Sequence, residues 1–313
     1  MDTTSYYACV IIAYIAFAFL GLLINYFNTD IIYLLSIMFV GVGCTSIVVD
    51  KIISDKNNNK PFYHNIYKDK SYMILSILNY LRLLLLIIAL SFKDLGAVNA
   101  TYLTFPIFVI ILGIPILKYI PTKNEILGVV LAFIGILIIN FNSLRRVITG
   151  KFTKIILYTF LFPLIASIVI SYIILLSKKY SHLTANQYIE AIFVPVIPIT
   201  IFICLLRNLP IFKKIFNYIC VPHIKPNIFK FFMVLLYAIL IFYPSNLIIY
   251  LFVKKYTAIL ASILSYVAIF MSFIIKKYYF KKKIKYHKIF GSFFVLGGII
   301  IISYATHKIK HLK

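Results

Sequence analysis

Apolar residues occur in long, nearly unbroken runs along the whole chain, and short polar connections separate the runs. About 20 residues of helix cross the ~30 Å hydrocarbon core of a bilayer, so each run of this length predicts a transmembrane helix. A β-barrel would instead show short segments in which apolar and polar residues alternate. The chain is therefore predicted to be an all-α integral membrane protein with ten transmembrane helices, at about residues 6–27, 30–49, 71–91, 95–117, 125–142, 155–176, 185–206, 229–251, 256–275 and 286–304.

Two connections are longer than the others and carry most of the polar residues between the spans. Residues 50–70 read DKIISDKNNNKPFYHNIYKDK and predict a polar loop. Residues 207–228 contain LPIFKKIFNYI, in which Pro210 suits the first turn of a short amphipathic helix. Such a helix would lie in the membrane interface.

The two halves of the chain resemble each other. Shifting LGAVNATYLTFP (residues 95–106) by 161 residues places it on YTAILASILSYV, and after a two-residue insertion the following spans also align. The paired small and hydroxyl residues are Ala97 and Ala258, Ala100 and Ala261, Thr101 and Ser262, Thr104 and Ser265, Gly128 and Gly291, and Gly135 and Gly298.

This similarity predicts two five-helix repeats, residues 1–150 and 151–313. An odd number of helices per repeat inverts the second copy relative to the first. Inverted repeats with a binding site at their interface, near the bilayer midplane, are a common transporter design. The repeat therefore makes transport the leading hypothesis for function.

Composition excludes a soluble protein. The 313 residues are 63% hydrophobic and 13% charged, with a mean hydropathy of +1.00, and no soluble domain could cover so much apolar surface. The net charge of +24 would suggest nucleic acid in a soluble chain, but here the lysines lie between the apolar runs. Abundant Ile, Lys, Asn, Tyr and Phe are typical of an AT-rich genome, and anionic lipid headgroups attract the remaining charge. We expect no nucleic-acid partner.

The distribution of Lys and Arg gives an ambiguous orientation. In the first half these residues favour a cytoplasmic N-terminus, whereas in the second half they favour the reverse, chiefly through KKYYFKKKIKYHK at residues 276–288. Early helices dominate the positive-inside rule, so we expect both termini in the cytoplasm.

One stretch resembles a known family. The segment AVNATYLTFPIFVIILGIPILKYIPTKNEILGVVLAFIGILII resembles the end of an EamA-type repeat of the drug/metabolite transporter superfamily. Such repeats combine a mid-helix proline, an acidic residue that opens the last helix, and two glycines seven residues apart. These are Pro106, Glu125, Gly128 and Gly135 here. The second half keeps Gly291 and Gly298 but has Val267 at the proline position and Lys288 near the acidic one.

The resemblance implies a ten-helix carrier with both termini cytoplasmic, moving a small organic solute by alternating access. Members of the superfamily carry amino acids, nucleotide-linked metabolites, amines and drugs, so the solute itself stays open. An amino acid or another anionic or zwitterionic metabolite is the leading expectation. A nucleotide-sugar or phosphate-ester antiporter is the alternative within the superfamily, and a membrane scaffold or scramblase is the alternative from another class.

Arg82 is the strongest candidate for substrate binding. It lies near the middle of the third span, in SILNYLRLLLLIIAL, where a charge costs at least about 2.5–3.5 kcal/mol unless it meets a cavity or a partner. Asn79 is three residues earlier and shares its helix face. We expect Arg82 to bind a carboxylate or phosphate of the substrate with Asn79 beside it. A structural pairing of Arg82 with a carboxylate or with helix carbonyls is the alternative.

Glu190, in NQYIEAIF, is the one carboxylate that the predicted spans place well inside a helix. Three roles fit this position. It could pair with Arg82, couple transport to protons, or reach the membrane interface. Only the second would make Glu190 a functional residue in its own right.

Other polar residues in the spans are weaker candidates. Asn99 and Tyr102 should contact water or solute, and Ser265 could line the cavity or allow close helix packing. In FYPSNLII, Pro244 frees a backbone carbonyl and can kink the helix, which makes Tyr243 and Asn246 possible lining residues.

The motifs of enzymes are absent from the sequence. There is no HExxH, no GxSxG and no CxxC pair among the four cysteines, and only eight residues are acidic. We therefore expect no enzyme, no cofactor and no metal site. The expected partners are a small-molecule solute, the lipid bilayer and a possible second copy in a homodimer. The expected location is a bacterial inner or plasma membrane, or an organelle membrane of an AT-rich eukaryote.

Overall fold

The computed structural model describes residues 3–27, 30–56, 61–91, 95–118, 120–141, 145, 149, 156–207, 209, 227–255, 264–265, 267–279, 281 and 283–310. Within these residues the chain is helical and has no strand. The expected interfacial helix at Pro210 and the paired positions Ala258, Ala261 and Ser262 lie outside the described residues.

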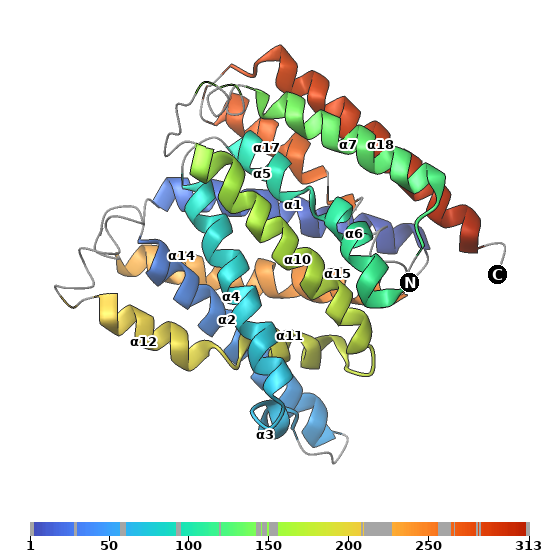
Figure 1. Ribbon diagram of the computed structural model, residues 1–313. Helices are drawn as coiled ribbons and strands as arrows, with labels where there is room; N and C mark the ends of the chain where they lie inside the picture. Colours follow the sequence, from blue (N-terminus) through green and yellow to red (C-terminus); the bar gives the residue numbers. More distant parts are fainter. Residues whose placement is uncertain are drawn as a thin grey trace.

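The elements follow the apolar runs closely (Figure 1). They are α1 (Thr3–Phe27), α2 (Ile31–Lys56), α3 (Tyr63–Ile66), α4 (Lys70–Leu90), α5 (Leu95–Tyr102), α6 (Phe105–Leu117), α7 (Lys123–Ile139), the π-helix η1 (Leu157–Leu161), α10 (Phe162–Lys179), α11 (Ala185–Phe193), α12 (Ile197–Arg207), α14 (Ile228–Tyr237), the π-helix η2 (Ala238–Phe242), α15 (Tyr243–Lys255), α17 (Val267–Tyr278) and α18 (Tyr286–Lys310).

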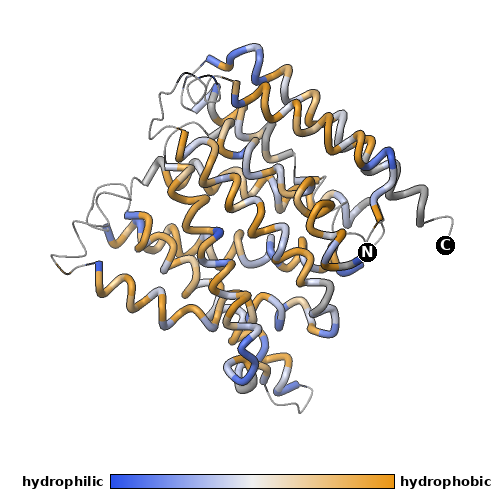
Figure 2. The backbone as a smooth tube through the Cα atoms, viewed as in Figure 1, coloured by the Kyte–Doolittle hydropathy of each residue, from blue (hydrophilic) through white to orange (hydrophobic). Residues whose placement is uncertain are grey.

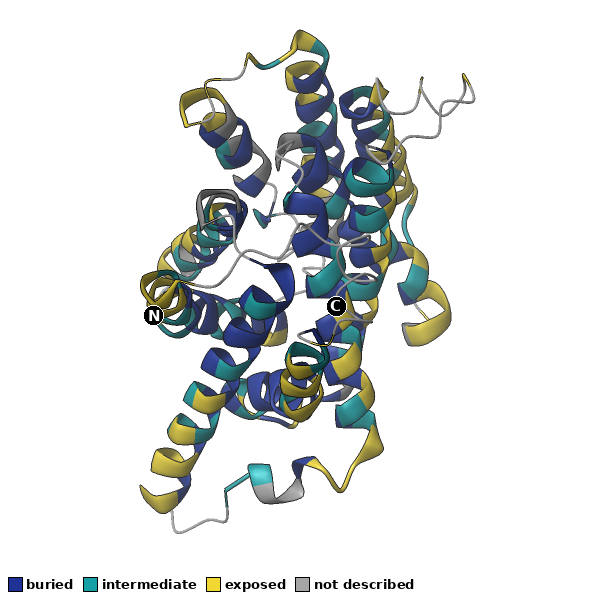
Figure 3. Ribbon diagram, turned by 90° about the vertical axis from the view of Figure 1, so that its left-hand side faces the viewer, coloured by how far each residue is buried: buried dark blue, intermediate teal, exposed yellow. Residues whose placement is uncertain are grey.

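Length and composition make six of the described helical segments able to cross a membrane. These are Ile31–Lys56, Lys70–Leu90, Ala97–Ile116, Leu157–Ser177, Ala185–Arg207 and Ile228–Lys255, and Ser5–Gly21 is a shorter apolar helix. Apolar residues cover most of the helical length, and hydrophilic residues gather at helix ends (Figure 2). Buried residues occupy the centre of the molecule, whereas exposed ones lie on the outer helices and at helix ends (Figure 3).

Side-chain caps fix where several helices begin. Thr122 and Glu125 form a reciprocal capping box at the start of α7, in which the Glu125 carboxylate accepts from the Thr122 backbone N–H at 2.7 Å. Thr184 and Gln187 do the same for α11. Glu125 is thus the acidic residue that opens the last helix of the first half, as expected from the sequence.

Prolines accompany a helix break or a π-helix in four of the described apolar segments. Pro106 follows the break between α5 and α6, and Pro195 lies in the break between α11 and α12, just before Pro198 of α12. Pro163 and Pro244 each come two residues after a π-helix, η1 and η2, because a proline offers no N–H to the carbonyl four residues earlier. These breaks leave backbone carbonyls available to side chains from neighbouring helices.

The helices pack in recurring pairs. α1 packs on α15 and α17, α4 packs on α10 and α11, and α10 also contacts α5 and α6. α2 packs against α11, α12, α14 and η2, while α7 and α18 lie side by side along one edge of the molecule (Figure 1).

Glycines bring α7 and α18 into very close contact. A Cβ atom built on Gly135 would lie 2.6 Å from the Gly291 carbonyl oxygen, and one built on Gly298 would lie 2.6 Å from the Ala132 backbone nitrogen and closer still to the Gly128 carbonyl oxygen. Only glycine allows such an approach, which is the small-residue packing typical of membrane helices. Gly128 therefore meets Gly298 and Gly135 meets Gly291, an antiparallel arrangement.

Candidate functional site

Arg82 lies inside the helix bundle. Its residue exposure is 5%, and its Nη1 donates a hydrogen bond to the Tyr102 hydroxyl at 3.1 Å. Its Nε has no hydrogen-bond partner, and no carboxylate of the described residues forms an ion pair with it. A buried guanidinium that lacks a counter-charge is costly, so it is available to an anion that enters the site.

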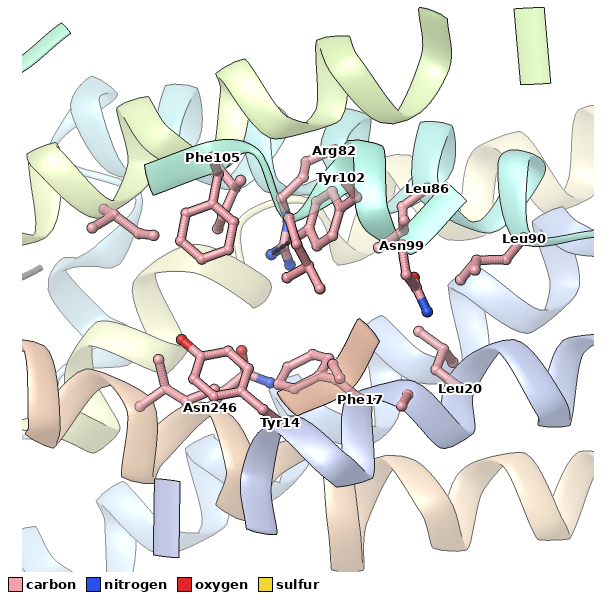
Figure 4. Close-up of a pocket in the computed structure, with 16 residues that line it drawn as sticks. Tyr14, Phe17, Leu20, Arg82, Leu86, Leu90, Asn99, Tyr102, Phe105 and Asn246 are labelled. Atoms are coloured by element: carbon pink, nitrogen blue, oxygen red, sulfur yellow. Dashed lines mark hydrogen bonds between the residues drawn. The ribbon is translucent and has the colours of Figure 1, made fainter. Parts of the chain in front are cut away.

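The break between α5 and α6 positions Tyr102. The residue ends α5, and Pro106 cannot donate to the Tyr102 carbonyl four residues earlier. The ring then stands beside Arg82 on the same wall of a cavity (Figure 4). The mid-helix proline expected from the sequence therefore shapes the surroundings of the buried arginine.

A cavity of about 100 Å³ lies in front of Arg82. A water needs roughly 10–15 Å³ of such space, so several waters or a small solute group would fit. Arg82 and Tyr102 face Tyr14, Phe17 and Asn246 across the opening (Figure 4). The full lining is Tyr14, Phe17, Ala18, Leu20, Arg82, Leu86, Leu90, Asn99, Tyr102, Leu103, Phe105, Ile170, Ile174, Asn246, Ile249 and Ala268.

A second cavity of about 70 Å³ adjoins the first. Its polar lining comes from Asn79, Arg82, Ser177, Tyr188, Asn246 and Tyr250. The rings of Tyr188 and Tyr250 stack there with centroids 4.1 Å apart. Arg82 and Asn246 border both cavities, so the guanidinium lies at their junction.

Asn79 docks α4 onto the break in the seventh apolar segment. Its Nδ2 donates to the Ile192 carbonyl oxygen at 3.2 Å, and the Ser76 hydroxyl donates to the same oxygen at 3.1 Å. The α-helix ends at Phe193, which leaves this carbonyl available. Asn79 thus lines the second cavity beside Arg82 while it also holds α11 in place.

Two further asparagines line the first cavity with their amides already held by the protein. The Asn99 Nδ2 donates to the Ser272 hydroxyl of α17, and the Asn246 Nδ2 donates to the Phe242 carbonyl oxygen at 2.7 Å. The structure brings Arg82, Asn99 and Asn246 to one cavity, together with Tyr102.

Tyr243 and Ser265 lie elsewhere. The Tyr243 hydroxyl donates to the Asn186 side-chain oxygen of α11, and neither Tyr243 nor the buried Ser265 is among the residues that line the two cavities. The Ser265 carbonyl accepts from the Ala268 N–H at the start of α17. Both residues therefore contact helices and do not face the cavity.

The hydroxyls of Thr101, in α5, and Thr104, directly before α6, hold helices together. Thr101 donates to the Ala97 carbonyl and accepts from the Asn140 side-chain amide at 2.9 Å. Thr104 shares a hydrogen bond of 2.7 Å with Ser167 of α10. Both hydroxyls are thus used in contacts within the protein.

Glu190 is fully buried, and neither of its carboxyl oxygens has a hydrogen-bond partner. It forms no ion pair with Arg82. It is also not the only carboxylate deep in a helix: α2 continues to Lys56, so Asp50, which the sequence assigned to the following loop, is a buried helical residue. Sequence reasoning ended that span too early.

Several residues of interest were missed in the sequence. Tyr14 and Phe17 of α1 line the first cavity, and a buried ion pair joins Asp30 to Arg207. The tyrosine beside small residues in AYIAFAF was an available signal for α1. Nothing in the sequence linked Asp30 to Arg207, because 177 positions separate them.

The long apolar helices define a multi-pass integral membrane protein, and Arg82 lies at its internal cavities. Residues 4–141 match the model of the EamA-like transporter family, which confirms the resemblance drawn from the sequence motifs. The family points to a transporter of the drug/metabolite type and away from an enzyme.

Structural comparison agrees at the level of the fold. A solved structure described as "Crystal structure of protein" covers 97% of this chain and 99% of its own, with a TM-score of 0.67 and 10% sequence identity. At this identity the likeness concerns the fold alone. No curated protein sequence matches the chain.

Proposed function

We propose that the protein is a secondary transporter that moves a small anionic or zwitterionic organic metabolite across the membrane by alternating access. The proposal rests above all on Arg82, a buried guanidinium with an unpartnered Nε that borders two cavities. The planar fork of arginine can donate two parallel hydrogen bonds to a carboxylate or phosphate. Arg82 is the proposed anchor, and the side chains of Asn99, Tyr102 and Asn246 orient the rest of the solute.

The positions of the two cavities along α4 support access from both sides. Leu86 and Leu90, toward the C-terminal end of α4, line the first cavity, whereas Asn79, toward its N-terminal end, lines the second. Arg82 lies between these groups of residues. A solute bound to the guanidinium can therefore be approached from either end of α4, which is the arrangement that alternating access requires.

The helix contacts support the proposal of ten spans in two inverted five-helix repeats, residues 1–150 and 151–313. Exchanging the halves pairs α1 with α10, α2 with α11–α12, α4 with α14–α15, α5–α6 with α17, and α7 with α18. Under this exchange the contact of α1 with α15 becomes the contact of α10 with α4. The contact of α1 with α17 becomes that of α10 with α5 and α6, and the contact of α4 with α11 becomes that of α14 with α2.

The two glycine contacts between α7 and α18 obey the same exchange. Gly128 corresponds to Gly291 and Gly135 to Gly298 in the repeat, so the contact of Gly135 with Gly291 becomes the contact of Gly298 with Gly128. Both contacts are present. This agreement supports the pairing of the halves that the sequence suggested.

A thermal-shift screen of the purified protein tests the proposal. Amino acids, dicarboxylates, phosphate esters and nucleotide sugars are the probes, and a solute that binds the folded state raises the melting temperature. Carboxylates without phosphate should stabilise the protein most under the leading proposal. Stabilisation by nucleotide sugars or phosphate esters would favour the antiporter alternative, and a protein that equilibrates no solute in proteoliposomes would favour a scaffold or scramblase.

Variants of Arg82 make the screen specific. Arg82→Lys keeps the charge and loses the fork, so the affinity for the stabilising anion should fall by about 1.5–3 kcal/mol, or roughly 10- to 150-fold. Arg82→Leu should insert in the membrane and neither bind nor transport. Arg145→Leu is the matched control, since Arg145 is exposed. Normal transport by Arg82→Leu would show that the arginine is not the anchor.

A further inference from the structure

Two buried carboxyls lie where α2 packs on α11. Asp50 of α2 is 3% exposed and Glu190 of α11 is 0% exposed. Asn186, one turn before Glu190, donates to the carbonyl of Ser46, one turn before Asp50, at 3.0 Å, so both carboxyls lie near this contact between the helices. Asp50 Oδ2 accepts the Phe62 backbone N–H at 2.6 Å, whereas both oxygens of Glu190 lack a partner.

Basic groups do not compensate these charges. Among the described residues, neither Asp50 nor Glu190 forms an ion pair with a lysine, arginine or histidine. Lys51, next to Asp50, is exposed, and Lys254 of the neighbouring α15 donates to the Leu183 carbonyl at 2.9 Å. Two unneutralised carboxylates in such a site would lose their hydration, which is a situation in which a carboxyl takes up a proton.

The far end of the same helix pair provides a contrast. There Asp30, at the start of α2, meets Arg207, at the end of α12, with both side chains fully buried and 2.9 Å between Arg207 Nη2 and Asp30 Oδ2. One end of the α2 and α11–α12 contact thus supplies its own cation. The end with Asp50 and Glu190 does not.

We propose that Glu190 carries a proton and that Glu190 and Asp50 form the proton-coupling site of the transporter. Binding a proton forms an O–H bond on Glu190 and changes the summed charge of the two carboxyls from −2 to −1; release breaks that bond and restores −2. The coupling role depends on the proposed transport function. The proton on Glu190 does not.

The other polar groups near the pair come from the helices that pack on α11. From α15, the Tyr243 hydroxyl donates to the Asn186 side-chain oxygen. Asn186 in turn donates to the Ser46 carbonyl of α2 at 3.0 Å. From α4, Arg82 lines the second cavity together with Tyr188, and no ion pair joins it to Glu190. The pair therefore has neutral hydrogen-bonding neighbours.

The helix that carries Glu190, α11, also forms one wall of the solute site. Tyr188, Ile189 and Ile192 of α11 line the second cavity, whereas Glu190 is not among its lining residues. The Ile192 carbonyl also receives the hydrogen bonds from α4 that hold Asn79 next to Arg82. A change in charge at Glu190 thus acts on the element that shapes the site around Arg82.

A proton suits the pair better than a metal ion. The described residues bring no group of three or more His, Cys, Asp or Glu side chains together. Zinc, magnesium and calcium take about four to eight ligands, more than two carboxyls and their neutral neighbours offer.

Infrared spectroscopy of the purified full-length protein tests for the proton on Glu190 without any solute. At pH 7 the wild type should show the carbonyl stretch of a protonated carboxylic acid, shifted in D₂O and lost in Glu190→Gln. Asp55→Asn, which removes an exposed carboxyl from the same helix, should keep the band. In Asp50→Asn the pH at which the band titrates should change. If Glu190→Gln does not fold, the wild-type and Asp50→Asn spectra still decide, because an unchanged titration or a missing band overturns the proposal.

Two further measurements separate the remaining outcomes. Na⁺ or K⁺ that raises the melting temperature of the wild type but not of Glu190→Gln, with no acid band, would assign the site to a metal cation and overturn the proposal. In proteoliposomes, Glu190→Gln should lose uptake driven by a pH gradient and retain solute exchange. An unchanged gradient dependence would overturn the coupling role. If the protein shows the carboxylic acid band but transports no solute, only the transport proposal is contradicted.

Discussion

The Arg82 guanidinium donates a hydrogen bond to the Tyr102 hydroxyl at 3.1 Å, and this contact joins an unbroken helix to a broken one. Tyr102 is the last residue of α5, and the chain resumes as a helix at Phe105. The orientation of the guanidinium thus depends on where α5 stops. The proposed anion anchor is pre-oriented by a residue from a different helix, which lowers the cost of ordering it when solute binds.

Tyr102→Phe should weaken anion binding without unfolding the protein. The change removes the hydroxyl that accepts from Arg82, at a typical cost of about 0.5–1.5 kcal/mol, or roughly 2- to 12-fold in affinity. Tyr172→Phe is the control, because Tyr172 is 38% exposed on α10. Binding of the stabilising anion from the thermal-shift screen measures the effect. Equal affinities for the two variants would mean that Tyr102 does not position the guanidinium.

Gly298→Ala should destabilise the crossing of α7 and α18. The added Cβ would lie 2.6 Å from the Ala132 backbone nitrogen, and backbone cannot yield as a side-chain tip can. Overpacking of this kind typically costs about 1–3 kcal/mol. Gly297→Ala is a matched control one residue away, since its Cβ would meet only the Leu131 Cδ2 at 3.4 Å. Melting curves in detergent should show a lower midpoint for Gly298→Ala alone; a similar loss in both variants would contradict the close contact.

Arg207→Met should be strongly destabilising because it leaves Asp30 buried without its counter-charge. Breaking one partner of a buried pair costs about 3–5 kcal/mol, whereas replacing both partners by apolar groups is often neutral. The double variant Asp30→Leu with Arg207→Met should therefore recover part of the stability lost in the single variant. Denaturation of both variants in detergent measures this difference. A double variant no more stable than the single one would indicate that Asp30 has another essential role.

Both termini should face the cytoplasm. The Lys and Arg distribution of the first half favours this orientation, and an even number of spans returns the chain to the side on which it began. A C-terminal fusion to a reporter that is active only in the cytoplasm should be active, and one that is active only outside should be silent. The reverse pattern would contradict a cytoplasmic C-terminus.

The positions of the helices were predictable because a run of about 20 apolar residues has few alternatives to a helix in a membrane. The end of α2 was not, since Asp50 and Lys51 read as the start of a loop. The helix continues for another turn and more, and the Asp50 carboxylate accepts the Phe62 N–H of the returning chain. That contact is tertiary, and no local pattern encodes it.

The site was partly predictable for a similar reason. A polar residue in an apolar run has to face the interior, so Arg82, Asn99 and Asn246 could be expected at one cavity, and the structure brings them together. Tyr14 and Phe17 could not, because aromatic residues occur on every side of α1 and none of them must avoid lipid. The two cases differ in the free-energy cost of placing the side chain in lipid. This cost is high for a guanidinium and absent for a phenyl ring.

The crossing of α7 and α18 has a further consequence. Gly128 and Gly135 on one helix meet Gly298 and Gly291 on the other in reverse order, with the same spacing on both. A contact with this property is self-complementary, as in a two-fold symmetric dimer. Two identical copies of a half-length chain could form the same contact. A protein of half the size, before any gene duplication, could therefore have dimerised through this crossing.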